Sequence, residues 1–60
     1  MRNDGVIDVK IEKKINCANH KTWFELFEME SGEVLFSGSQ IECEGFYKTL
    51  DQYDYELING

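Results

Sequence analysis

The chain has 60 residues, of which 42% are hydrophobic and 13% aromatic, and a formal net charge of −6. This length allows one domain over residues 1–60 that buries about 60% of the surface of its unfolded chain, and the hydrophobic content excludes intrinsic disorder. No apolar run approaches the roughly 20 residues of a membrane span, and the N-terminus lacks the apolar stretch of a signal peptide. We therefore expect a cytoplasmic protein without membrane contact.

Residues 6–15 are predicted to form the first strand. Apolar and charged side chains alternate along it, with Ile7, Val9, Ile11 and Ile15 on one face and Asp8, Lys10, Glu12 and Lys14 on the other. A period of two over β-branched residues is typical of a half-buried strand. The turn of residues 16–21 follows and contains Cys17 and His20. With the distant Cys43 these supply fewer ligands than the four that zinc needs, so we predict free thiols and no metal site.

Residues 22–30 and 33–37 are predicted to form a hairpin around Ser31-Gly32, because glycine supplies the positive φ of a two-residue turn. This turn pairs Met29 with Val34 and Phe27 with Phe36. The predicted core face therefore comprises Trp23, Phe27, Met29, Val34 and Phe36. The opposite face would carry a smaller apolar patch formed by Phe24, Leu26 and Leu35. Since such a patch favours association and the core is small, we predict a homodimer with this patch as its interface.

Ser39 followed by Glu42 forms a capping box, which predicts a helix that starts near Ser39. An apolar stripe then recurs at helical spacing, formed by Cys43, Phe46, Tyr47 and Leu50. Residues 53–58 alternate again and predict a short last strand. The predicted fold is α+β: a small, mostly antiparallel sheet in the order β-β-β-α-β, with one helix packed on one face.

The sequence contains no catalytic signature. There is no phosphate-binding glycine loop, no Ser-His-Asp set, no histidine cluster and no calcium loop, and 60 residues leave little room for an enclosed substrate pocket. We therefore predict no catalytic residues, no cofactor and no enzymatic activity.

The charges are unevenly distributed along the chain. Residues 1–21 hold five of the six bases, whereas residues 22–60 hold nine of the twelve acids and one base, Lys48. An acidic surface repels nucleic acids and attracts basic surfaces, including clefts that hold DNA or RNA. The predicted partner is therefore a protein with a basic cleft and not a nucleic acid. The alternative is that the acidity only keeps the protein soluble.

Two groups of residues are candidates for binding such a partner. The acidic candidates lie around the hairpin and in the first helical turn, where the helix dipole alone also favours acids; they are Glu25, Glu28, Glu30, Glu33, Glu42 and Glu44. The aromatic candidates are Phe46 and Tyr47. Each either packs on the sheet or inserts, exposed, into a pocket of the partner. Adjacent helical residues point about 100° apart, so at most one of them lies at the centre of the core-facing stripe.

The stretch from Trp23 to Ser39, with Glu42-Cys43 and Phe46, resembles a pattern common in small uncharacterised proteins of phages and their bacterial hosts. Residues 22–58 also resemble the small acidic uracil-DNA glycosylase inhibitors of Bacillus phages, in size, acidity and the order of hairpin, helix and last strand. That resemblance implies a dimer that blocks a DNA-binding cleft by mimicking DNA, with Phe46 as the inserted aromatic. The chain departs from the family at Tyr47 and Leu50, where the family has an acid and a tyrosine, and residues 6–15 have no counterpart.

These observations lead to two functional hypotheses. The first is a non-enzymatic, phage-type inhibitor that binds a nucleic-acid-binding protein of the host by DNA mimicry, with a uracil-DNA glycosylase as the named target. The second is a structural or protein-interaction module that docks through an apolar patch or a strand edge.

Overall fold

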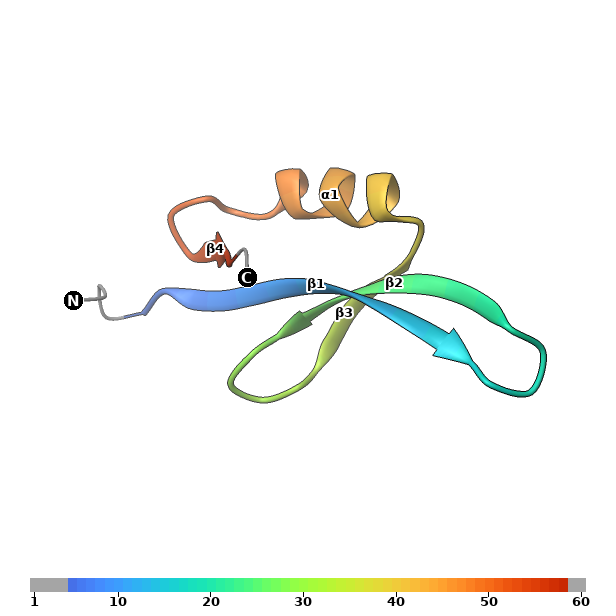
Figure 1. Ribbon diagram of the computed structural model, residues 1–60. Coiled ribbons are helices and arrows are strands. Elements are labelled where there is room, and N and C mark those ends of the chain that lie inside the picture. The colour runs from blue at the N-terminus through green and yellow to red at the C-terminus, as the bar shows by residue number, and fades with distance from the viewer. Residues whose placement is uncertain (1–4, 59–60) are drawn as a thin grey trace.

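The computed structural model describes residues 5–58, which form a four-stranded sheet with one helix on one of its faces (Figure 1). The elements are β1 (Ile7–Asn16), β2 (Lys21–Glu28), β3 (Val34–Gly38), α1 (Gln40–Thr49) and β4 (Tyr55–Leu57). The strands lie in the order β3-β2-β1-β4. The predicted α+β class, the order of elements and the helix on one face are confirmed.

The sheet is mixed. β1, β2 and β3 pair antiparallel, as expected of strands joined by hairpins, whereas β4 pairs parallel with β1. Parallel strands need a crossover, and α1 is the crossover that carries the chain from β3, at one edge of the sheet, to β4 at the other.

The predicted capping box starts α1. Ser39 Oγ accepts a hydrogen bond from the Glu42 backbone N–H at 3.1 Å, and the Ser39 backbone N–H donates to Glu42 Oε1 at 2.9 Å. Both bonds satisfy backbone or side-chain groups that the first helical turn would otherwise leave without partners. The helix ends where Leu50 adopts an extended conformation.

The core lies between α1 and the sheet. Val9 of β1, Leu26 of β2 and Cys43 of α1 are fully buried. Half-buried apolar side chains pack around these three, namely Ile7, Ile11, Phe24, Leu35, Phe36, Phe46, Tyr47, Leu50, Tyr55 and Leu57. The rings of Phe36 and Phe46 stack with their centroids 5.0 Å apart, which joins β3 to the helix.

The predicted core face of β2 is wrong. Leu26 is paired with Phe36 and Phe24 with Gly38, one residue away from the predicted register, and a β-bulge follows Leu26. The connection spans residues 29–33, longer than a two-residue turn, although Gly32 has the expected positive φ of 78°. A shift by one residue exchanges the two faces of a strand.

The predicted dimer patch is therefore not a surface patch. Leu26 is fully buried, and Phe24 and Leu35 pack against the core with it. The large side chains that were expected inside, Trp23 and Phe27, lie on the opposite face of the sheet, because they alternate with Phe24 and Leu26 along β2.

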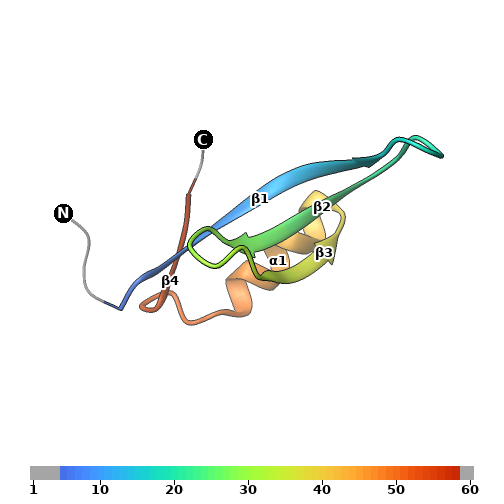
Figure 2. The same ribbon diagram turned by 90° about the horizontal axis from the view of Figure 1, so that it is seen from below.

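The molecule is elongated, with extents of 41 × 20 × 18 Å. β1 and β2 continue past the ends of β3 and β4 as a two-stranded ribbon, which projects at one end of the sheet in Figure 2. The tip is a tight turn in which His20 takes a positive φ of 59° and the side-chain oxygens of Asn16 and Asn19 accept backbone hydrogen bonds. No helix within residues 5–58 is long and apolar enough to cross a membrane.

Candidate functional site

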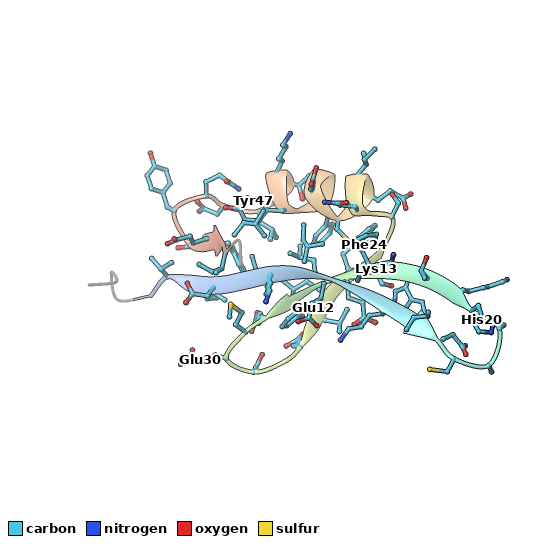
Figure 3. The ribbon with its side chains drawn as sticks, in the orientation of Figure 1. Glu12, Lys13, His20, Phe24, Glu30 and Tyr47 are labelled. Carbon is cyan, nitrogen blue, oxygen red and sulfur yellow. The ribbon has the colours of Figure 1, made fainter. Side chains whose placement is uncertain are left out.

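One face of the sheet has no covering layer in the described part of the chain, and we call it the open face (Figure 2). Strand alternation brings to it the side chains that point away from the core. They are Asp8, Lys10, Glu12 and Lys14 of β1, Trp23, Glu25 and Phe27 of β2, and Val34 and Ser37 of β3. Figure 3 shows Glu12 on this side of the sheet and Tyr47 on the other side, between α1 and the sheet.

Cross-strand pairs of β1 and β2 form a ladder on the open face. Glu12 lies opposite Glu25, an arrangement of like charges that destabilises a sheet unless it is compensated. Lys14 Nζ lies 3.1 Å from Glu12 Oε1, and Lys10 Nζ lies 3.9 Å from Glu12 Oε2. Trp23 Nε1–H donates to Glu25 Oε2 at 2.9 Å. The lysines and the indole thus compensate the paired carboxylates.

A shallow hollow lies at the end of the open face that is remote from the ribbon tip. It has a volume of about 280 Å³ and is lined by Val6, Asp8, Met29 and Glu30. Met29 is 46% exposed, so an apolar side chain forms part of its wall. We call it the face hollow.

The second feature is an unpaired length of β1. β4 pairs only with Ile7–Val9, where the Ile7 backbone N–H donates to Asp54 O and the Val9 carbonyl accepts from Ile58 N–H. Backbone groups alternate in direction along a strand, so those of Ile11, Lys13 and Ile15 point the same way as those of Ile7 and Val9. No other strand of the described residues pairs with them. We call this row of backbone groups the β1 edge.

A pocket of about 220 Å³ adjoins the β1 edge. It is lined by Lys10, Ile11, Phe24, Gln40, Glu44, Leu57 and Ile58, so it lies between the first half of α1, the end of β4 and β1. Ile11, Phe24 and Leu57 give it apolar walls, whereas Gln40 and Glu44 are exposed polar residues of the helix. We call it the edge pocket.

The structure distributes the predicted acidic residues over three places. Glu28, Glu30 and Glu33 lie at the end of β2 and in the connection to β3, Glu42 and Glu44 lie on α1, and Glu25 lies on the open face. The ion pairs between described residues are those of Glu12 with Lys10 and Lys14. None of the six predicted glutamates therefore has a cationic partner among residues 5–58, and they are not brought together on one face.

Phe46 and Tyr47 both pack on the sheet side of α1. Phe46 stacks on Phe36. The Tyr47 hydroxyl donates to the Tyr55 carbonyl at 3.3 Å and accepts from the Leu57 backbone N–H at 3.2 Å. The packing interpretation is confirmed for both residues, and an inserting role would require either side chain to leave these contacts.

The two cysteines are free thiols in different environments. Cys43 is buried, and its Sγ lies 3.5 Å from the Phe24 carbonyl. Burial raises the pKa of the Cys43 thiol above its ordinary value of 9.0, and the nearby Glu42 carboxylate raises it further. Cys17 is exposed in the ribbon turn. Within the described residues, no three His, Cys, Asp or Glu side chains are grouped so as to hold a metal ion.

Sequence reasoning missed the β1 edge, although one signal for it was present. The alternating pattern of the first strand extends over ten residues, whereas that of the last segment extends over six at most. A long strand beside a short one must leave part of its edge unpaired. The open face was missed because the predicted register of the hairpin reversed the two faces of β2.

Comparisons of the chain with protein-family models, curated proteins and solved structures found no match.

Proposed function

We propose that this chain is a non-enzymatic protein-binding domain that accepts an extended segment of a partner protein along the β1 edge. The observation that carries the proposal is the row of unpaired backbone groups at Ile11, Lys13 and Ile15, next to the edge pocket. In binding by strand addition, backbone hydrogen bonds supply affinity and a pocket for alternate side chains supplies specificity. Both parts of such a site lie side by side here.

The residues along the β1 edge define the chemistry of the segment. Side chains of an added strand would alternate in step with those of β1, so the residue beside Ile11 would face α1 and enter the edge pocket. The apolar walls of that pocket favour an apolar residue. The residue two positions away would lie beside Lys13, which is exposed, and an acidic side chain makes the stabilising cross-strand pair. The ligand is thus an extended segment with an apolar and an acidic residue two positions apart.

Charge argues against a second copy of this chain as the occupant of the β1 edge. Two copies that paired antiparallel about a central residue of the edge would place that residue opposite itself. The three central residues are Glu12, Lys13 and Lys14, and each choice sets like charges directly opposite each other, which is destabilising. A lysine on an exposed strand edge is also a common protection against uncontrolled pairing. The edge is suited to a partner of complementary charge.

The test is selection of displayed random decapeptides on the immobilised protein and on Lys13→Glu. The wild-type protein should enrich segments with an apolar and an acidic residue two positions apart. The Lys13→Glu variant should instead enrich segments in which Lys or Arg takes the place of the acidic residue. The matched control is Lys14→Glu, because Lys14 lies on the open face and its backbone pairs with β2; it should select the same segments as wild type. Amide exchange should slow at Ile11, Lys13 and Ile15 when a selected peptide binds. Peptides that protect other amides, or a preference that ignores Lys13, would refute the proposal.

A second candidate function is the acidic inhibitor that binds a basic, nucleic-acid-binding cleft, with a uracil-DNA glycosylase as its target. It is supported by the six glutamates that have no cationic partner among the described residues. Attraction between exposed charges is screened by salt, whereas strand addition responds little. The test is inhibition of a bacterial uracil-DNA glycosylase at low and high ionic strength. This candidate is favoured over strand addition if the chain inhibits at low ionic strength but not at high ionic strength, and if inhibition is lost in the triple variant Glu28→Gln, Glu30→Gln, Glu33→Gln.

A further inference from the structure

The open face carries large apolar side chains among its charged ones. The outward face of an antiparallel sheet is ordinarily polar, yet this one carries Trp23 and Phe27, both half-buried, and Val34, which is 47% exposed. Met29 continues the same stripe at the face hollow. An apolar patch of this kind marks an interaction site, and a chain of 60 residues gains core volume by covering it.

The charges on the β1 side of the open face are self-complementary. Along β1 they read Asp8, Lys10, Glu12 and Lys14, so the signs alternate from negative to positive. When this row is laid against a reversed copy of itself, Lys10 faces Glu12 and Lys14 faces Asp8, and every pair joins opposite charges. When it is related to a copy in the same direction by the two-fold axis of a closed dimer, each residue lies opposite itself and every pair joins like charges. Charge complementarity of this kind selects partner and orientation.

From this pattern we propose that the open face binds the open face of a second copy of this chain, with the strands of the two copies antiparallel. Asp8 and Lys14 of one copy are six residues apart along β1, which is about 20 Å at roughly 3.3 Å per residue. A two-fold axis midway between them brings Trp23, beside Lys14 in the ladder, over the face hollow of the other copy. Each indole then contacts the apolar wall that Met29 provides.

A stable dimer needs a large share of the surface of so small a chain. A standard interface covers about 800 Å² per partner, against a total accessible surface of 4630 Å² for the chain. A dimer of standard size would therefore cover about a sixth of the surface of each copy. The proposal does not depend on strand addition at the β1 edge, since its apolar residues Trp23, Phe27 and Met29 do not line the edge pocket and Lys10 alone belongs to both surfaces.

Sedimentation equilibrium tests the surface. The wild-type chain should be dimeric at micromolar concentrations. Phe27→Asp, at the centre of the open face, should raise the dissociation constant by about 30-fold or more, the loss expected of an interface hot spot. Ile41→Asp is the matched control because Ile41 is 80% exposed on α1, and it should leave the constant within about threefold. A wild-type chain that is monomeric at about 1 mM would overturn the proposal and leave the open face to a different protein.

Charge reversal tests the orientation with variants that conserve the apolar residues. Lys10→Glu and Glu12→Lys should each weaken the dimer about tenfold, because each places like charges between copies. An equimolar mixture of the two variants should form a heterodimer that regains most of the wild-type affinity. Single variants that dimerise as tightly as the wild type would overturn the antiparallel arrangement. This test does not use Phe27→Asp, so it remains valid if that variant fails to fold.

Discussion

Leu26→Ala should destabilise the protein more than Phe27→Ala, although the two residues are neighbours and phenylalanine is the larger. Leu26 is fully buried with Val9 and Cys43, and the cost of replacing a buried leucine by alanine is about 2–5 kcal/mol. Phe27 is half-buried on the open face. Full burial of such a side chain contributes about 1.5–3 kcal/mol, so half of that, about 1 kcal/mol, is its expected contribution in the monomer.

The difference is large compared with the total stability. A domain of this size has a free energy of unfolding of about 3–9 kcal/mol, so Leu26→Ala removes a substantial fraction of it. Urea denaturation followed by far-ultraviolet circular dichroism measures both variants, at a protein concentration at which both are monomeric. If Leu26→Ala does not fold at all while Phe27→Ala does, the order of stabilities is already the expected one, because a loss as large as the total stability abolishes folding.

The result that would refute the reasoning is the reverse order of stabilities. A larger loss for Phe27→Ala would mean that Trp23 and Phe27 face the helix, as the two-residue turn predicts, and that the pairing of Leu26 with Phe36 is not the register in solution.

Two further predictions concern the contacts of α1. Tyr47→Phe leaves the Leu57 backbone N–H without its acceptor, so it should cost about 1–3 kcal/mol and speed amide exchange at Leu57, whereas Tyr53→Phe, at a side chain that is 91% exposed, should change neither. The pKa of the Cys43 thiol is raised in the folded state above its ordinary value of 9.0, so the stability linked to this thiol is fully present below pH 9 and is lost as the pH rises through the folded-state pKa. The free energy of unfolding should therefore fall more steeply above pH 9 in the wild type than in Cys43→Ala, with Cys17→Ala behaving like the wild type; equal slopes for all three would contradict the burial of Cys43.

The elements that could be predicted from the sequence depend on interactions between near neighbours. The capping box joins Ser39 to Glu42, three residues away. The alternation of β1 is visible in its own ten residues, and Gly32 supplies a positive φ within one loop. Each of these features has a local cause, so a local pattern contains enough information to predict it.

The faces of β2 could not be predicted in the same way, because both carry large apolar residues. Trp23 and Phe27 on one face compete with Phe24 and Leu26 on the other. The choice between them depends on the length of the β2–β3 connection and on pairing with β1, where Leu26 lies opposite Ile11. A shift of one residue in the register of β2 exchanges its buried and exposed faces. The amino-acid composition of the strand does not determine so small a shift.

The candidate sites depend even less on local sequence patterns than the faces of β2 do. The β1 edge exists because β4, more than 40 residues away in the sequence, pairs with β1 in parallel and ends at Leu57. The edge pocket needs residues of β1, β2, α1 and β4 together. The acidic residues could be listed from the sequence, but their separation between the hairpin, the helix and the open face follows from the tertiary structure.

The two proposed surfaces can be occupied at the same time, and this affects how binding data are interpreted. The backbone groups of the β1 edge point within the plane of the sheet, and the edge pocket opens beside α1, whereas the open face points perpendicular to the sheet on the side away from α1. A dimer formed through the open faces therefore leaves one β1 edge accessible on each copy. Two such edges held at a fixed spacing bind a partner that offers two segments far more tightly than one edge does. Binding measured on a surface coated with partner would then weaken in Phe27→Asp through loss of the dimer, although Phe27 is not in the edge pocket. Binding of a single peptide in solution is free of this effect, because it reports the β1 edge alone.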